Sequence, residues 1–413
     1  MSQQIVHKVA IVGGGAAGLF AGCFLKRAGA DFVILEKNPE CGKKLLLTGH
    51  GRCNITNLKP PRDLKKGYHE EGNFVYPAIS GFAPSDCFSF FTEELGVSLK
   101  TEENDRVFPK SDKAADIRDS MARYIGSKHM VTGFDVTSIK QNKDRFILRA
   151  SSGSEVCASK VILSTGGASY PATGSDGSGY KLAGSLGHTI TDIRASLSAV
   201  ATDADFCSPL SGITLENVQL ALYYGGSKKA SSDGSLLFTH NGISGPAVMM
   251  ISREIPAEIT GDTYFLADLA PDLTAQQLAL DVNSSPNSKF VNILSRYVPK
   301  NLALQVVQDK DILCHELSAN ARKDSLRSLK EHRFDILKKP DVKTAYCTRG
   351  GVTTDEVDRK TYESSVVKGL YIVGELLDVD GISGGYNLAF AAGSSALAVK
   401  DILNKISEVS KSS

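Results

Sequence analysis

The sequence contains no pair of cysteines at the close spacing that zinc sites and redox disulfides require. Its eight cysteines stand singly at positions 23, 41, 53, 87, 157, 207, 314 and 347 of the 413 residues. Because structural zinc sites and disulfide scaffolds need clustered cysteines, both are excluded as organising features. The scatter predicts small buried residues in a protein of the reducing cytoplasm, and no metal site.

An excess of charge of one sign is also missing. Lys and Arg total 47 against 46 Asp and Glu, which leaves a net charge of +1 at pH 7. Such a balance gives no general attraction to nucleic acid or to an anionic membrane, and we expect neither as a partner. One stretch is locally basic, but Asp324, Glu331 and Asp335 interrupt it, as is typical of a solvated face. Its basic residues are Arg322, Lys323, Arg327, Lys330, Arg333, Lys338 and Lys339.

Long apolar runs are the third absence. No run approaches the ~20 apolar residues with which a helix crosses a bilayer. The first residues, Met1-Ser2-Gln3-Gln4, are polar and lead straight into an apolar strand pattern, so we expect no signal peptide. These features predict a cytoplasmic protein with a small-molecule substrate, and they give no indication of the oligomeric state.

A glycine-rich turn stands near each end of the chain. The first follows the apolar run 8–12 and consists of Gly13, Gly14, Gly15, Ala16, Ala17 and Gly18. Strand, glycine turn and helix form the phosphate-binding unit of dinucleotide-binding folds, because the glycines let backbone N–H groups approach a pyrophosphate. A second strand pattern, 31–35, ends at Glu36, whose carboxylate can accept hydrogen bonds from the adenosine ribose. That charge would repel a 2′-phosphate, so NADP is disfavoured at this first site.

The second turn follows a strand pattern at 370–373 and opens an Ala-rich helix. The positive end of that helix would stabilise the negative charge of a reduced flavin near its N1 atom and C2 carbonyl. Glu375 or Asp378 would hold the ribityl hydroxyls. We therefore predict one FAD molecule bridging the two ends of the sequence. The residues assigned to it here are Gly374, Glu375, Asp378, Gly384, Gly385, Tyr386, Asn387 and Leu388.

Two further loops complete the predicted cofactor site. The stretch 41–57 places glycines between polar side chains, as a loop that wraps a ligand requires, although an exposed turn is the alternative. Within it, Lys43 or Lys44 would neutralise the pyrophosphate, and Thr48 and Asn54 would reach a flavin edge. A strand pattern at 156–163 leads to a turn at the carboxyl edge of a parallel sheet, where ligands bind. That turn supplies Thr165, Gly166 and Gly167, and the remaining assignments are Lys37, Gly49, Arg52, Cys53 and Val136.

The middle of the chain has a different pattern of predicted secondary structure. Short strand-like runs separated by turn residues follow 193, and helix-like segments follow 274. We predict an α/β fold in which a Rossmann-like FAD-binding domain, 1–192 and 345–413, is interrupted by an insertion. The insertion comprises a β-barrel-like sheet, 193–270 and 330–344, and a small helical domain, 271–329. Within the first domain, the apolar pattern at 131–139 predicts a single strand.

Four stretches carry a resemblance to a known family: GGGAAGL at 13–19, GKKLLLTGHGRCNITN at 42–57, STGGASYPATGSDGSGYKLAGSLGH at 164–188, and GLYIVGELLDVDGISGGYNLAFAAG at 369–393. They resemble the BaiN-like family of bacterial FAD-dependent oxidoreductases, which includes YhiN-like and aminoacetone-oxidase-like proteins. The third stretch is also similar to the fumarate reductase and succinate dehydrogenase flavoproteins. The resemblance implies an FAD domain split by a barrel-like sheet and a helical piece. His50 stands where members of the family commonly have glycine.

The predicted reaction is hydride transfer between the flavin and a small organic substrate, either reduction of an activated C=C bond or oxidation of an amine. Arg349 would polarise a carbonyl, and His50, His240 and Tyr386 are acid–base candidates; Arg349 and His50 are the two catalytic assignments. Cys53 is a possible redox thiol. No second dinucleotide fingerprint follows a strand, so NAD(P)H would dock only transiently as an electron donor. Two alternatives remain open, a flavin-dependent RNA-modifying enzyme and a non-catalytic flavin-binding regulator.

Overall fold

The computed structural model describes residues 6–412, with side chains described as far as residue 408. The expectation of no signal peptide concerns residues 1–4, which lie outside this range. The chain divides into two compact units: unit 1 comprises Met1–Ile193 and Val342–Ser413, and unit 2 comprises Arg194–Asp341. Unit 1 holds a mostly parallel sheet and unit 2 a second sheet, so the predicted α/β fold class is confirmed. The finer boundaries, including a separate helical domain at 271–329, stay predictions.

Unit 1 is built on a seven-stranded sheet in the order β6-β2-β1-β9-β8-β7, with β18 pairing with β9. Strands β6, β2, β1, β9 and β18 are parallel, and β8 and β7 form an antiparallel extension. Consecutive residues of β1 and β9, Val9–Val12 and Val161–Leu163, are buried, so both faces of these strands are covered and their sequences are apolar. The bounds are β1 (Val6–Val12), β2 (Phe32–Glu36), β6 (Met130–Thr132), β7 (Val136–Asn142), β8 (Arg145–Ala150), β9 (Glu155–Leu163) and β18 (Leu370–Ile372).

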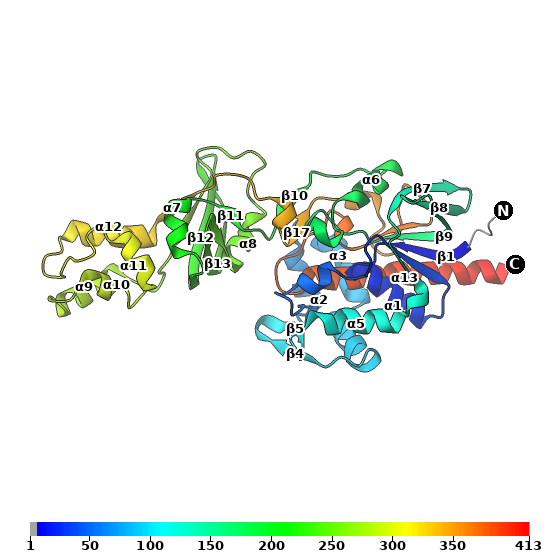
Figure 1. The fold of residues 1–413 in the computed structure, drawn as a ribbon, viewed down its shortest axis with the longest axis horizontal. Helices are drawn as coiled ribbons and strands as arrows, with labels where there is room; N and C mark the ends of the chain where they lie inside the picture. The colour runs from blue at the N-terminus through cyan, green and yellow to red at the C-terminus, as the bar shows by residue number, and fades with distance from the viewer. Residues whose placement is uncertain (1–5, 413) are drawn as a thin grey trace. The chain divides into compact units, whose positions relative to one another are not determined.

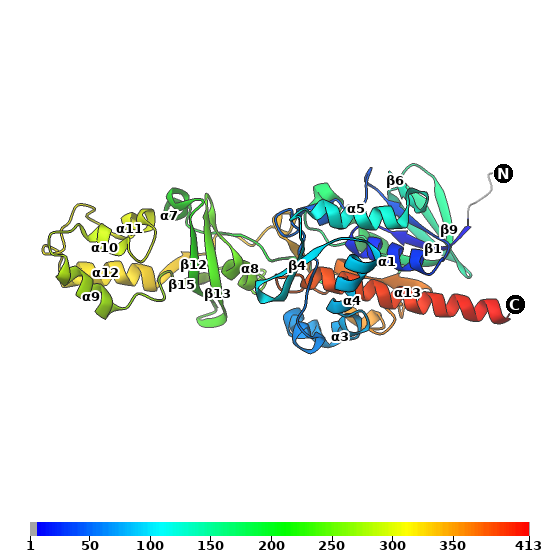
Figure 2. The same ribbon diagram turned by 90° about the horizontal axis from the view of Figure 1, so that it is seen from below.

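The long C-terminal helix α13 (Tyr386–Ser412) runs alongside α1 (Ala16–Arg27), as Figures 1 and 2 show. The Ser395 hydroxyl of α13 donates to the Ala17 carbonyl of α1 at 2.9 Å. On another side, a Cβ placed on Gly393 would stand 2.5 Å from the carbonyl oxygen of Ala78. The small residues of α13 therefore let it lie close to two helices at once, which explains its Ala-rich composition.

The other elements of unit 1 are short. A three-stranded antiparallel sheet, in the order β3-β5-β4, follows the loop that begins at Cys41. The strands of this sheet are β3 (Thr56–Asn57), β4 (Leu99–Glu102) and β5 (Arg106–Pro109). Unit 1 also contains the short strand β17 (Cys347–Arg349), which lies outside this sheet. The helices are α2 (Pro61–Leu64), α3 (Gly72–Gly81), α4 (Pro84–Ser89), α5 (Ala114–Ile125) and α6 (Ser178–Ser185).

The single strand predicted at 131–139 is wrong, because the chain forms two strands there. Strand β6 pairs with β2, whereas β7 pairs with β8. Between them, Gly133 N donates to Asn38 O at 3.0 Å and Phe134 N donates to Glu36 O at 2.9 Å. These bonds fold the chain over the end of β2, and the apolar pattern alone does not contain that long-range pairing.

Unit 2 contains a six-stranded antiparallel sheet in the order β11-β14-β13-β12-β15-β16. Leu337 N, just after β16, donates to Ala201 O of β11 at 3.1 Å, so the two outer strands approach each other as in a barrel. Phe238, Phe265 and Phe334 are fully buried in its core. The strands of this sheet are β11 (Val200–Ala201), β12 (Thr214–Tyr224), β13 (Ser227–Thr239), β14 (Gly242–Ser244), β15 (Tyr264–Asp268) and β16 (His332–Asp335), and β10 (Arg194–Ser196) lies outside it.

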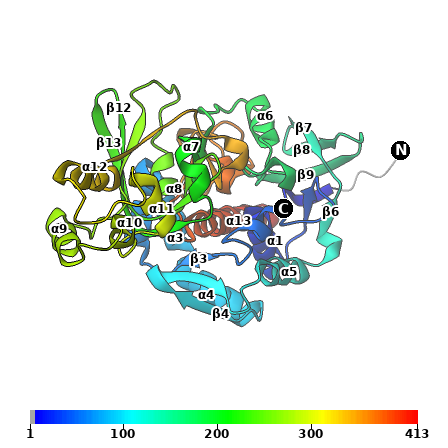
Figure 3. The ribbon, with the colours of Figure 1, turned by 60° about the vertical axis from the view of Figure 1, so that its left-hand side comes forward.

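The helices of unit 2 are mostly short, and Figure 3 shows four of them, α9 to α12, gathered beside the β12–β13 hairpin. None of the helices among the described residues combines the length and apolar character needed to cross a bilayer. The bounds are α7 (Ala204–Cys207), α8 (Pro246–Ser252), α9 (Ala275–Ser284), α10 (Phe290–Leu294), α11 (Lys300–Val306) and α12 (Ala319–Lys330).

Candidate functional site

The two glycine-rich turns meet at one edge of the unit 1 sheet. Val12, at the end of β1, pairs with Leu163 at the end of β9, and Leu163 pairs with Ile372 at the end of β18. The turns that follow these strands therefore begin side by side. A Cβ placed on Gly374 would stand 2.9 Å from the Cβ of Ala17 in the first turn of α1. Segments from opposite ends of the sequence thus form one site.

The N-terminus of α1 is open. Gly15 is its N-cap residue, and no side chain of the described residues hydrogen-bonds there as a cap. The nearest atom to a Cβ placed on Gly15 would be Ser164 O, 3.9 Å away, whereas a Cβ on Gly18 would overlap Gly13 O. Gly13 itself has a φ of +100°, which favours glycine. An open helix N-terminus with unpaired N–H groups is suited to hold phosphate.

Glu36 is buried at the end of β2 and lies beside this turn. Its Oε2 accepts a hydrogen bond from Gly14 N at 2.7 Å, and its Oε1 accepts from Asn38 N at 2.8 Å and Asn38 Nδ2 at 2.7 Å. A carboxylate has about four acceptor positions, so one position remains for a ribose hydroxyl. Val136, predicted to contact the cofactor, is buried at the start of β7, two residues beyond Phe134, which bonds to the Glu36 carbonyl.

Two of the three lysines assigned to the cofactor, Lys37 and Lys44, pair with carboxylates. Lys44 Nζ lies 2.7 Å from Glu375 Oε2 and donates to Ser169 Oγ at 2.6 Å. Lys37 Nζ pairs with Asp176 at 2.7 Å. Lys43 is half-buried just before the helical turn that begins at Lys44. Lys44 and Glu375 therefore bond to each other in this structure, and their predicted roles on pyrophosphate and on ribityl hydroxyls stay predictions.

Contacts with neighbouring segments hold the loop from Thr48 to Cys53. Thr48 Oγ1 donates to Leu45 O at 2.6 Å, and the Arg52 guanidinium lies 4.0 Å from the centre of the Phe108 ring. Cys53 is fully buried, and burial raises the pKa of its thiol to about 12, against a smaller lowering by a hydrogen bond with Thr48. The prediction of a redox thiol at Cys53 is therefore wrong, since a reactive cysteine needs an accessible thiolate.

Two polar atoms near the second glycine turn are buried without a hydrogen-bond partner among the described residues. They are Asn54 Oδ1 and Thr56 Oγ1. A Cβ on Gly385 would stand 3.0 Å from Asn54 Oδ1 and would overlap the carbonyl oxygen of Thr56. Gly49 packs against the backbone of the same loop, with its Cβ position 3.0 Å from Asn54 N. Buried polar atoms normally have partners, so this pair marks a place where a polar ligand group fits.

The residues at the start of α13 mainly support the turn. Asn387 Oδ1 accepts from Gly381 N at 2.8 Å, and its Nδ2 donates to Gly381 O at 2.9 Å. Gly384 has a φ of +116° and Leu388 is half-buried on the first turn of the helix. Asp378 is also engaged, because its Oδ1 accepts from Gly350 N at 2.9 Å.

Tyr386 packs in the core at the start of α13. It is buried, and its ring covers Gly67, where any Cβ would overlap it. The hydroxyl of the neighbouring Tyr68 donates to the Tyr386 carbonyl oxygen at 2.7 Å. The acid–base role expected of Tyr386 stays a prediction.

The third turn extends the site toward β17. Thr165 Oγ1 is buried without a hydrogen-bond partner among the described residues, as are Asn54 Oδ1 and Thr56 Oγ1. Gly166 has a φ of +73°, and a Cβ on Gly167 would stand 3.1 Å from Glu375 Oε1. Thr348 N donates to the same Glu375 oxygen at 2.9 Å. The turn after β9 therefore joins the segment that follows β18.

The predicted catalytic residues have different surroundings. Arg349 is half-buried, and its Nη2 lies 3.4 Å from Oε1 of the exposed Glu70. His50 is exposed, and its Nε2 lies 3.3 Å from the Tyr346 hydroxyl. Both belong to unit 1, whereas His240 is exposed at the end of β13 in unit 2. The structure thus places two of these candidates in the unit that contains the glycine turns.

Sequence reasoning missed the partners that hold these residues. Asn38 fixes Glu36, and its Nδ2 also donates to Thr173 O at 3.0 Å. Ser169 and Thr348 join the Lys44–Glu375 pair from segments far apart in the chain. The position of Asn38 could have been recognised from the sequence, since it lies two residues after Glu36. Ser169 and Thr348 could not have been recognised, because only tertiary contacts bring them to Lys44 and Glu375.

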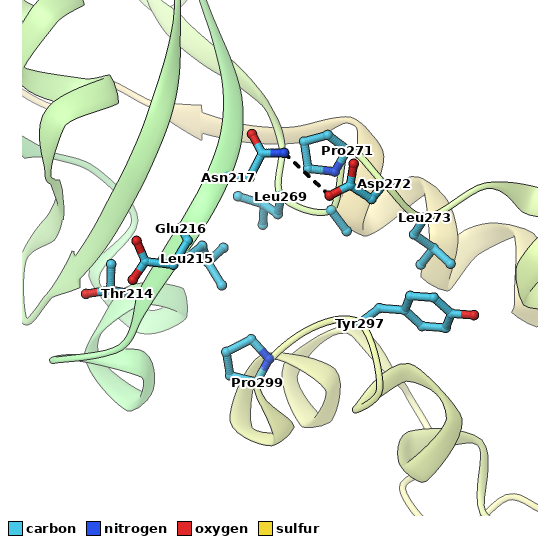
Figure 4. A pocket seen from close by; sticks show the side chains of 11 residues that line it. Thr214, Leu215, Glu216, Asn217, Leu269, Pro271, Asp272, Leu273, Tyr297 and Pro299 are labelled. Carbon is cyan, nitrogen blue, oxygen red and sulfur yellow. Dashed lines mark hydrogen bonds between the residues drawn. The ribbon is translucent and has the colours of Figure 1, made fainter. Parts of the chain in front are cut away.

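A separate hollow of about 240 Å³ lies in unit 2, between the start of β12 and the helical segment (Figure 4). Asn217 Nδ2 donates to Asp272 Oδ2 at its rim, at 3.4 Å. Tyr297 and Pro299 line its other side. It contains none of the residues that the sequence assigned to the cofactor or to catalysis.

Comparisons with known proteins agree with the Rossmann-like architecture of unit 1. A family model described as the HI0933-like protein Rossmann domain matches residues 7–401. A 3-dehydro-bile acid delta(4,6)-reductase of Clostridium scindens is 31% identical over 407 residues, 95% of this chain and 98% of the relative. A ribosomal RNA dihydrouridine synthase of Haemophilus influenzae is 32% identical over 401 residues, 92% of this chain and 94% of the relative.

Solved structures show the fold. A 3-ketosteroid delta1-dehydrogenase from Sterolibacterium denitrificans has a TM-score of 0.51 at 13% identity, with 97% of this chain and all of that chain (100%) covered. At this identity the likeness concerns the arrangement of the backbone and carries no substrate information.

Proposed function

Because the chain belongs to the family of HI0933-like proteins with a Rossmann domain and is an FAD-dependent oxidoreductase, we propose that it reduces a C=C bond conjugated to a carbonyl. The family resemblance predicted from the four sequence stretches is confirmed. Of the two reactions left open by the sequence, reduction of an activated double bond is the one that the relatives' names support. Amine oxidation and a purely regulatory role stay predictions without such support.

The names of the two relatives describe the same bond change. A delta(4,6)-reductase of a 3-dehydro-bile acid saturates double bonds conjugated to a ketone, and a dihydrouridine synthase saturates the ring double bond of uracil, which is conjugated to a carbonyl. Across an α,β double bond the hydride adds to the carbon β to the carbonyl and a proton adds to the α carbon; across the second double bond of a dienone they add to the δ and γ carbons. The reduced flavin would supply the hydride, and a transiently docked NADH or NADPH would supply the electrons to reduce it.

The residues of unit 1 would bind and orient the cofactor. The N–H groups at the start of α1 would bind the pyrophosphate, and the remaining acceptor position of Glu36 would bind the ribose. Asn54 and Thr56 would present their unpartnered oxygen atoms to the flavin ring beside Gly385. The observation that carries this proposal is the junction of the two glycine turns, with buried polar atoms that lack protein partners beside it.

RNA is the second candidate substrate, because a relative that covers nearly the whole chain is named a ribosomal RNA dihydrouridine synthase. The expectation of no nucleic-acid partner rests on the net charge of +1 and stays a prediction. The two candidates share the reaction and differ in how much of the substrate must be bound. A test therefore has to offer both substrates to the same reduced enzyme.

The test begins with purified protein reduced by NADH or NADPH without oxygen, followed at the flavin absorbance bands. A 3-keto-4-ene steroid, a panel of amines and unmodified ribosomal RNA are then added separately, and products are identified by mass. The proposal expects flavin reoxidation together with the gain of two hydrogens by the steroid or by uridines of the RNA. Reoxidation by neither, or reduction of the oxidised flavin by an amine, contradicts it.

A further inference from the structure

Three aromatic side chains of unit 1 form a cluster beside the junction of the glycine turns. The Tyr346 hydroxyl lies 3.3 Å from His50 Nε2, and their ring centres are 6.1 Å apart. Tyr170 meets Tyr346 edge to face, with ring centres 6.1 Å apart and planes at 83°. His50 is exposed and the two tyrosines are half-buried, so the cluster presents aromatic surface that the protein does not cover.

The backbone shows that two of these side chains are held against a local preference. His50 has a φ of +57° and Tyr170 a φ of +56°, in the left-handed region that favours glycine. Gly49 and Gly51, on either side of His50, are left-handed as well. A non-glycine residue in this region stores roughly 1–3 kcal/mol, and such residues gather at ligand-binding sites. The left-handed backbone at His50 therefore lowers the stability of the fold. Because the His50 side chain is exposed, core packing does not account for a non-glycine residue there.

The cluster is joined to the site through its neighbours in the chain. Tyr170 follows Ser169, whose hydroxyl receives a hydrogen bond from Lys44 Nζ, the partner of Glu375. Tyr346 precedes Cys347, whose Sγ accepts a hydrogen bond from Asn387 Nδ2 at 3.8 Å. Tyr170 and Tyr346 are therefore each adjacent in sequence to a residue that is bonded toward the segments after β18. Ser169 is linked through Lys44 to Glu375, and Cys347 is bonded to Asn387.

We propose that His50, Tyr170 and Tyr346 form the substrate subsite and stack on a planar ring that contains a conjugated carbonyl. This inference rests on the proposed function, which requires such a ring beside the flavin. The Tyr346 hydroxyl and the His50 imidazole supply polar groups at the edge of the stack, where a ring carbonyl has to be hydrogen-bonded. Burial raises the pKa of Tyr346, so its hydroxyl stays protonated and donates at neutral pH. Uracil is a planar conjugated carbonyl ring, and the enone portion of a steroid A ring is a planar conjugated carbonyl group.

Binding is the measurement that tests the subsite without any turnover. The dissociation constants of testosterone and uridine monophosphate are measured for the oxidised, flavin-loaded protein by calorimetry, with dihydrouridine monophosphate as a probe whose ring is not planar. Aromatic stacking contributes ~1–3 kcal/mol per ring, so Tyr346→Leu should weaken binding of at least one planar probe by about tenfold. Tyr346→Phe keeps the ring and should weaken binding by less.

The matched variants separate stacking from folding. His50→Gly places the residue suited to a φ of +57° there, so the protein should fold normally and still lose several-fold in affinity for the planar probe. Tyr223→Leu is the control, because Tyr223 stacks on Tyr264 at 5.2 Å in unit 2 and should leave binding unchanged.

Unchanged dissociation constants in both Tyr346→Leu and His50→Gly would overturn the subsite, whatever the enzyme reduces. If these variants raise the dissociation constant but the unsubstituted enzyme reduces neither substrate class, the subsite is retained and the proposed function is contradicted. The lower of the two dissociation constants, for testosterone or for uridine monophosphate, shows whether the subsite prefers a steroid enone or a uracil ring.

Discussion

The glycines of the first turn differ in what surrounds them. At Gly15 a Cβ would meet its nearest atom only at 3.9 Å, and the φ of −74° suits any residue. At Gly18 a Cβ would overlap the carbonyl oxygen of Gly13. The first position is therefore kept free for a ligand, and the second is needed for the strand and helix to pack.

This contrast gives a matched pair of substitutions. Gly15→Ala should leave the unfolding temperature of the flavin-free protein nearly unchanged and reduce flavin content severalfold, because the methyl group stands where phosphate would approach. Gly18→Ala should lower both. The two quantities are measured by thermal unfolding of the stripped protein and by absorbance of the purified one. Normal flavin content in Gly15→Ala would contradict the placement of phosphate at this helix.

Cys53 allows a test of burial at the same scale. With the pKa of its thiol raised to about 12, almost no thiolate exists at pH 8, and the fraction rises only as the pH approaches that value. Iodoacetamide should therefore not modify Cys53 in the native protein at pH 8, and should modify it fully once the protein is unfolded in urea. Labelled peptides are read by mass spectrometry, and rapid native labelling would show that the loop opens.

At the scale of elements, the Lys44–Glu375 pair joins the loop after β2 to the segment after β18. Both side chains are mostly buried, 21% and 19% exposed, and Thr348 N and Ser169 Oγ complete the set. Removing Lys44 leaves Glu375 buried with fewer donors. We expect Lys44→Met to lower the free energy of unfolding by ~1–3 kcal/mol, measured by urea denaturation.

A surface pair provides the control. Lys66 pairs with Asp63 at 2.7 Å, but these side chains are 71% and 50% exposed. Water and salt screen such pairs, so Lys66→Met should change the unfolding curve too little to measure. Equal effects of the two substitutions would mean that the Lys44–Glu375 pair is as solvated as the surface pair.

Elements with a strong local pattern could be predicted from the sequence, and those set by distant contacts could not. The strands before both glycine turns and the helix opened by Tyr386 follow from apolar runs and glycines. The division of 131–139 into two strands depends on bonds from Gly133 and Phe134 to the end of β2, which no local pattern encodes. For the same reason the glycine turns were recognisable, while the pairing of Lys44 with Glu375 was not.

At the scale of the whole molecule, both glycine turns belong to unit 1 although nearly the entire chain separates them. A ligand that contacts both turns ties the first strand to the last helix and stabilises unit 1 against opening. At a hundredfold excess over its dissociation constant, this linkage amounts to ~2.7 kcal/mol. Unit 2 has a core of its own, which includes Phe238 and Phe265, and gains nothing directly from that contact.

Hydrogen exchange can locate this stabilisation. Adding FAD to the flavin-free protein should slow amide exchange in β1, β9, β18 and the first turns of α1 and α13, and should leave residues 194–341 nearly unchanged. The Gly15→Ala variant serves as the control, because it should show little slowing at the same FAD concentration. Protection spread evenly over both units, or protection confined to the N-terminal turn without β18 and α13, would contradict a cofactor that joins the two ends of the chain.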